Sequence, residues 1–89
     1  MVTISPQAEI AIRSLLPSDK KRVEQQLALL DHFPDGVSDN VKRLSGSDNL
    51  YIMRATGALR ILFRRTSQTI EVMDVFTRDR LEQMHEHAG

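Results

Sequence analysis

The spacing of apolar residues changes near residue 50, and this change constrains the fold more than any other feature of the sequence. Before it, apolar residues recur at helical intervals, and after it they alternate with polar residues, which is the period of a β-strand. The pattern predicts two helices, then three consecutive antiparallel strands: helices over residues 6–16 and 18–33, and strands over residues 50–55, 58–65 and 69–76.

Helix-start and helix-stop signals support the two-helix part of this prediction. Ser5 can cap the first free amides of a helix, and Pro6 suits its first position. Pro17 is predicted to stop this helix, and Ser18 or Asp19 to cap the next one. Because the link between the helices is short, we expect them to lie side by side and antiparallel.

The remaining segments complete an α+β architecture. Residues 2–4 are β-prone, residues 34–49 are polar and predicted to form a long loop, and residues 77–87 are typical of a short helix or a frayed tail. The predicted order is β-α-α-β-β-β, with a two-helix hairpin packed on one face of a small, mostly antiparallel four-stranded sheet. The strand over residues 69–76 is apolar on both faces, which favours a position inside the sheet.

Length and composition limit the classes of protein to consider. The chain has 89 residues, so we expect one domain over residues 1–89. It has no cysteine, which excludes disulfides, thiolate metal sites and a cysteine nucleophile, and its three histidines lack metal-ligand spacing. We therefore expect no metal and no cofactor. No apolar run approaches the length of a membrane span, and no signal peptide is recognisable, so we expect a cytoplasmic protein without a membrane partner.

Charge is segregated along the chain although the net charge is zero. Residues 40–70 carry six basic groups and one acid, and residues 49–70 carry four arginines and no acid. Residues 1–39 and 71–89 are net acidic. Because salt screens a charge within about 10 Å, local charge decides which ligand a surface attracts. The basic block therefore favours a phosphate-binding face.

Several short motifs resemble the RelE/ParE superfamily of toxins from type II toxin–antitoxin systems. Residues 2–8 (VTISPQA) resemble the family's first strand and its S-P-x-A helix start, and residues 41–46 (VKRLSG) its V-K-x-L-x-G loop. Residues 50–54 (LYIMR) and 59–63 (LRILF) are similar to the strands L-Y-R-L-R and Y-R-V-I-Y. The match covers about residues 2–80 and implies the same α+β fold, no cofactor and a cognate antitoxin.

The resemblance implies a toxin that cleaves mRNA on the ribosome as a metal-independent endoribonuclease and is neutralised by its antitoxin. Two alternatives stay open: a ParE-like toxin acting on DNA gyrase, and a degenerate member that only binds an antitoxin. The family's motif V-G-H-R aligns with residues 75–78, so Thr77 stands where many members have histidine. Glu82 stands near the family's tyrosine position, and both differences favour the alternatives.

The same alignment yields candidate site residues. Arg60 and Arg78 are predicted to stabilise the charge that develops on a phosphate, and Glu82 or His85 to transfer a proton. Four further cations are predicted to bind RNA phosphates: Lys42, Arg43, Arg54 and Arg64. Read without the family, these arginines are also compatible with a solvated strand face or with structural ion pairs.

Two other groups of residues give expectations. Asp74 lies in an otherwise apolar strand, so its carboxylate needs a partner such as a nearby arginine, for example Arg60, unless it acts as a base. Four apolar residues are expected on the arginine-bearing face, where they can form a groove for an antitoxin segment: Leu50, Ile52, Leu62 and Phe76.

Overall fold

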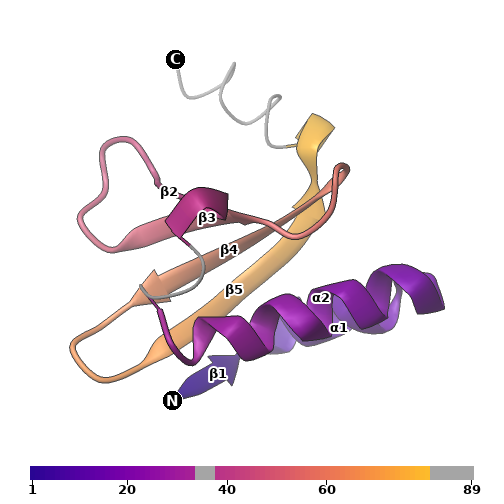
Figure 1. The fold of residues 1–89 in the computed structure, drawn as a ribbon, viewed down its shortest axis with the longest axis horizontal. Helices are drawn as coiled ribbons and strands as arrows, with labels where there is room; N and C mark the ends of the chain where they lie inside the picture. The colour runs from indigo at the N-terminus through magenta and orange to yellow at the C-terminus, as the bar shows by residue number, and fades with distance from the viewer. Residues whose placement is uncertain (34–37, 81–89) are drawn as a thin grey trace.

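Two helices lie side by side against one face of a twisted sheet (Figure 1). This arrangement is seen in a computed structural model, which describes residues 1–33 and 38–80. The elements follow the order β1 (Val2–Ile4), α1 (Pro6–Arg13), α2 (Pro17–Leu30), the 3-10 turn η1 (Ser38–Asn40), β2 (Val41–Arg43), β3 (Leu50–Arg54), β4 (Leu59–Arg65) and β5 (Ile70–Thr77). The predicted α+β fold is confirmed.

The sheet has the strand order β1-β5-β4-β3-β2. β1 pairs with β5 in parallel, and all the other neighbours are antiparallel. The three predicted strands after residue 50 are confirmed as consecutive antiparallel neighbours. β5 lies between β1 and β4, which explains why its sequence is apolar on both faces.

The sheet has one strand more than the four predicted. β2 lies inside the stretch that we expected to be a loop, where Val41 pairs with Met53 and Arg43 with Tyr51. Three residues are too few to show a period of two, and the pairing partner is distant in sequence. β2 covers the edge of β3, whose backbone groups would otherwise be unpaired.

The core forms between the helices and the facing side of the sheet. α1 contributes Ala8 and Ile12, and α2 contributes Val23 and Leu30, with the predicted helical spacing. From the sheet, alternate residues point inward, including Met53, Ile61, Phe63 and Val72, which are all fully buried. Because alternate residues of a strand point to opposite faces, Arg54 and Arg60 lie on the face away from the helices.

The start of α2 differs from the prediction. Leu16 is the N-cap residue and makes no side-chain hydrogen bond, and Pro17 is the first residue of α2. A cap by Ser18 or Asp19 is therefore wrong. Proline holds the residue before it in an extended conformation and has no N–H to satisfy, so Pro17 begins α2. α1 has already ended at Arg13, with Ser14 as its C-cap residue, earlier than the predicted end at residue 16.

The apolar residues expected to form a groove on the arginine-bearing face are only partly exposed to solvent. Leu50, Ile52 and Leu62 are half-buried. Phe76 is 5% exposed, and the Arg80 guanidinium lies over its ring at 5.7 Å from the centroid. None of the helices in residues 1–33 and 38–80 has the length and apolar character needed to cross a membrane.

Candidate functional site: a cationic cavity

A cavity of about 490 Å³ opens on the sheet face that points away from the helices. Of the ten described residues that line it, five are cations and one is an acid, Asp39. The cations come from β2, β3, β4 and the residue after β5: Lys42, Arg43, Arg54, Arg60 and Arg78. Such a lining favours an anionic ligand, because nearby positive charges reinforce one another.

The strand register brings the central cations together. Arg54 on β3 lies directly opposite Arg60 on β4, and Lys42 on β2 lies opposite Ile52 on β3. Like charges that face each other across a strand pair reduce stability, so the Arg54–Arg60 pair works against folding. An anion bound between the two arginines would attract both of them, so the pair suits an anionic ligand.

Hydrogen bonds anchor Arg60 to the turn that joins β3 and β4. Its Nη1 donates to the carbonyl oxygens of Thr56 at 2.9 Å and Leu59 at 3.0 Å. The turn is itself held by the Thr56 hydroxyl, which accepts from the Leu59 amide at 3.1 Å. Arg60 is thus oriented by neighbouring backbone, as a charge-stabilising group requires.

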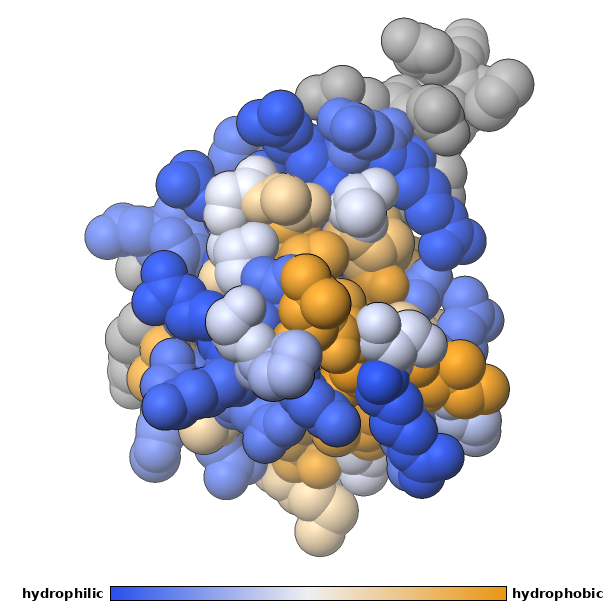
Figure 2. Space-filling view, turned by 90° about the vertical axis from the view of Figure 1, so that its right-hand side faces the viewer, coloured by the Kyte–Doolittle hydropathy of each residue, from blue (hydrophilic) through white to orange (hydrophobic). Residues whose placement is uncertain are grey.

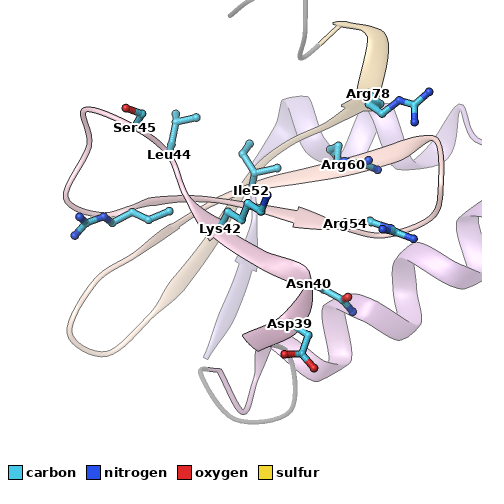
Figure 3. A pocket seen from close by; sticks show the side chains of 10 residues that line it. Asp39, Asn40, Lys42, Leu44, Ser45, Ile52, Arg54, Arg60 and Arg78 are labelled. Atoms are coloured by element: carbon cyan, nitrogen blue, oxygen red, sulfur yellow. The ribbon is translucent and has the colours of Figure 1, made fainter.

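Arg78, the residue after β5, lines the same cavity as Arg60. Its backbone N–H donates to the carbonyl of Ala58 in the β3–β4 turn at 2.8 Å. Figure 3 shows Arg54, Arg60 and Arg78 gathered at one end of the cavity, with Lys42 and Ile52 farther along it. Two neighbouring strands and the residue after β5 therefore bring three guanidinium groups to one site.

The other predicted site residues lie elsewhere. Arg64 is not in the lining and forms an ion pair with Glu71 on β5. Glu82 and His85 lie outside the described residues. Thr77, which stands at the family's histidine position, has a structural role, because its hydroxyl accepts from the Arg80 amide at 3.3 Å and caps the helical turn that follows.

Sequence reasoning missed several lining residues. Asp39 and Asn40 belong to η1, within the predicted loop, and no local signal indicated that this loop folds back over the sheet. Leu44 and Ser45 also line the cavity and belong to the VKRLSG motif, so the resemblance was the available signal for them. Within the described part of the chain, no three His, Asp or Glu side chains gather in a way that could hold a metal ion.

The fold is shared with solved structures of RelE toxins. The archaeal RelE–RelB complex from Pyrococcus horikoshii superposes with a TM-score of 0.74 at 24% identity, covering 89% of this chain and 94% of that one. The RelBE2 complex from Mycobacterium tuberculosis gives 0.73 at 22% identity, covering 88% and 96%. Isolated RelE from E. coli gives 0.71 at 14% identity, covering 97% and 96%.

No family model matches the sequence, and no curated protein sequence is significantly similar to it. The fold is therefore the basis on which this chain can be classified. Two helices on a twisted sheet, over nearly the whole length of both chains, make it a RelE fold.

Proposed function

We propose that this protein is a RelE-like toxin that cleaves mRNA on the ribosome and is neutralised by a cognate antitoxin. The observation that carries the proposal is the convergence of Arg54, Arg60 and Arg78 in one cavity of a RelE fold. The lining matches the polyanionic character of RNA, and its volume of about 490 Å³ is in the range of small-ligand sites.

The proposed chemistry is transesterification within the RNA. The ribose 2′-oxygen attacks the adjacent phosphorus, the bond from phosphorus to the 5′-oxygen breaks, and a 2′,3′-cyclic phosphate and a 5′-hydroxyl result. Negative charge builds on the phosphate oxygens in the transition state, and Arg60 and Arg78 stabilise it through charge-assisted hydrogen bonds. Lys42, Arg43 and Arg54 hold the neighbouring phosphates. Glu82 and His85 remain the candidates for proton transfer.

A proteinaceous antitoxin fits the surface as well as the fold. The neighbouring structures from Pyrococcus horikoshii and Mycobacterium tuberculosis are toxin–antitoxin complexes. In this chain the helical layer leaves apolar residues exposed, with Ile10 at 64% and Leu16 at 70%. Figure 2 shows apolar side chains at the surface on one side of the molecule, among hydrophilic ones. An antitoxin with apolar side chains could cover these exposed residues, and its carboxylates could pair with the arginines of the cavity.

Expression in bacterial cells without antitoxin tests the proposal. Wild type is compared with Arg60→Ala, Glu82→Ala and His85→Ala, and the 5′ ends of cellular mRNA are mapped. Wild type should inhibit growth and generate new ends within coding sequences. Arg60→Ala should lose about 10²–10³-fold in cleavage rate, because one donor to the developing charge is removed.

Arg64→Ala is the matched control, because Arg64 lies on the same strand and face as Arg60 but outside the cavity. This variant should cleave like wild type. Growth inhibition without new mRNA ends would overturn the nuclease function, and a DNA gyrase supercoiling assay would then test the ParE-like alternative. A wild type that is harmless at full expression would leave only antitoxin binding.

A further inference from the structure

Asp74 is the one charged side chain that is buried in the described part of the chain, with the residue 8% exposed. Burying a carboxylate is costly unless it is paired and hydrogen-bonded. Asp74 does not line the cavity, so its burial is not explained by contact with RNA. The burial of Asp74 therefore depends on the groups that it contacts inside the protein.

A β-bulge places Asp74 at the border between the sheet and α1. Leu62 pairs with Asp74 but Phe63 pairs with Val72, so Met73 is the extra residue in β5. The Met73 carbonyl accepts from the Ser5 hydroxyl at 2.8 Å, which fastens the start of α1 to the bulge. β1 ends opposite Val72, so the edge of β5 beyond that point is open to α1.

The Asp74 carboxylate joins three segments of the chain. One oxygen, Oδ2, accepts from the Gln7 amide on α1 at 3.0 Å and lies 3.7 Å from the Arg80 guanidinium. The other, Oδ1, accepts from the Val75 backbone N–H at 2.8 Å. Arg80 also covers the ring of Phe76, so it is held against β5 by an ion pair and a cation–π contact.

These contacts surround Arg78. On one side of it, the Thr77 hydroxyl caps the turn through the Arg80 amide, and on the other, Asp74 holds the Arg80 side chain. The Arg78 backbone itself bonds to Ala58, beside Arg60. The turn over residues 77–80 is therefore held at Thr77 and at Arg80, and Arg78 lies between them at the end of the cavity that Arg60 also lines (Figure 3).

We propose that Asp74 is a positioning residue that acts through Arg80: the buried carboxylate fixes the turn over residues 77–80 and so holds the Arg78 guanidinium beside Arg60. The part of this inference that concerns catalysis rests on the proposed function. The part that concerns the turn does not, because it follows from the contacts alone. The experiment separates the two.

Amide hydrogen exchange followed by NMR tests the positioning without any substrate. In Asp74→Asn and in Arg80→Gln, the Arg78 amide should exchange at least about tenfold faster than in wild type, because its bond to Ala58 opens more often. The Ile61 amide in the core should keep its wild-type rate. Arg80 is half-exposed, so Arg80→Gln leaves the buried Asp74 site less disturbed and still tests the link if Asp74→Asn folds poorly.

Single-turnover cleavage of ribosome-bound mRNA tests the catalytic consequence. Asp74→Asn and Arg80→Gln should each lose about tenfold or more in rate, because displacing a catalytic group by about 1 Å can cost up to about 10²-fold. Arg78→Ala removes the group that Asp74 positions. Adding Asp74→Asn to Arg78→Ala should therefore cost less than a further factor of about two. Glu9→Gln, which breaks the exposed Glu9–Arg13 pair, is the matched control and should cleave like wild type.

Two results would overturn the inference: an unchanged Arg78 exchange rate in both variants, or losses that multiply when Asp74→Asn is combined with Arg78→Ala. The second would show that Asp74 acts independently of Arg78. If wild type does not cleave mRNA at all, the proposed function fails, and the exchange rates still decide whether Asp74 holds the turn.

Discussion

At the scale of single residues, the Arg54–Arg60 pair shows how the site differs from the rest of the sheet. The two residues are directly opposite each other on β3 and β4, where an opposite-charge or apolar pair would stabilise the hairpin. Arg64, farther along β4, has such a stabilising partner in Glu71. The Arg54–Arg60 pair lines the cavity, and the Arg64–Glu71 pair lies outside it.

Replacing Arg54 should therefore stabilise the fold while weakening RNA binding. For Arg54→Thr we expect a gain of about 0.5 kcal/mol in the free energy of unfolding at low salt, because the cross-strand repulsion is removed and threonine suits a strand. Urea unfolding measures the gain, and fluorescence anisotropy with a short single-stranded RNA measures the loss of affinity. A gain that persists unchanged in 1 M salt would show that repulsion is not its cause.

At the scale of secondary structure, the two helices begin in different ways. The Ser5 hydroxyl accepts from the Ala8 amide at 3.1 Å and donates to the Met73 carbonyl at 2.8 Å, so it both caps α1 and attaches it to β5. α2 has no side-chain cap and depends on Pro17 and on the packing of Val23 and Leu30. The start of α1 is thus held by more hydrogen bonds than the start of α2, and it lies next to the β-bulge at Met73 and Asp74.

This difference predicts unequal effects of two serine substitutions. Ser5→Ala should lower the free energy of unfolding by about 1–2 kcal/mol, because a capping bond and a partly buried bond to the sheet are both lost. Ser18→Ala is the control and should stay within about 0.5 kcal/mol of wild type. Urea unfolding of both variants provides the measurement. Equal losses would mean that Ser5 does not act as the cap.

At the scale of the whole molecule, a chain of zero net charge has a cavity lined mainly by cations. The acid-free block over residues 49–70 supplies Arg54 and Arg60, while β2 and the end of β5 supply the other cations. Acidic residues outside the block balance the total charge, and among the described residues Asp39 is the acid that lines the cavity. Net charge is therefore a poor guide to what this protein binds.

The salt dependence of RNA binding measures how many of these cations contact phosphates. For a single strand, three to five contacts predict a slope of log affinity against log salt of about −2 to −3.5. Arg60→Ala should reduce the steepness by about 0.7, and Arg64→Ala should leave it unchanged. Binding that is indifferent to salt would contradict a phosphate-binding role for the cavity.

Apolar periodicity, helix-start residues and the basic block predicted the faces of the strands, the start of α1 and the cations of the cavity from the sequence alone. The alternation after residue 50 placed Ile61 and Phe63 inside and Arg60 outside, because a strand has only two faces. Ser5 and Pro6 determined the start of α1. The basic block and the family resemblance named all five cations that the cavity contains.

Tertiary structure decided what depends on contacts between distant segments. β2 forms because Val41 and Arg43 pair with residues at the edge of β3. η1 places Asp39 in the lining of the cavity. No local sequence pattern predicts either contact. Arg64 is set apart from the other arginines because the register of β4 and β5 places Glu71 beside it. The partner of Asp74 likewise depends on a bulge and on the turn that follows β5. Register, bulges and edges are properties of pairs of strands, so the sequence of one strand cannot specify them.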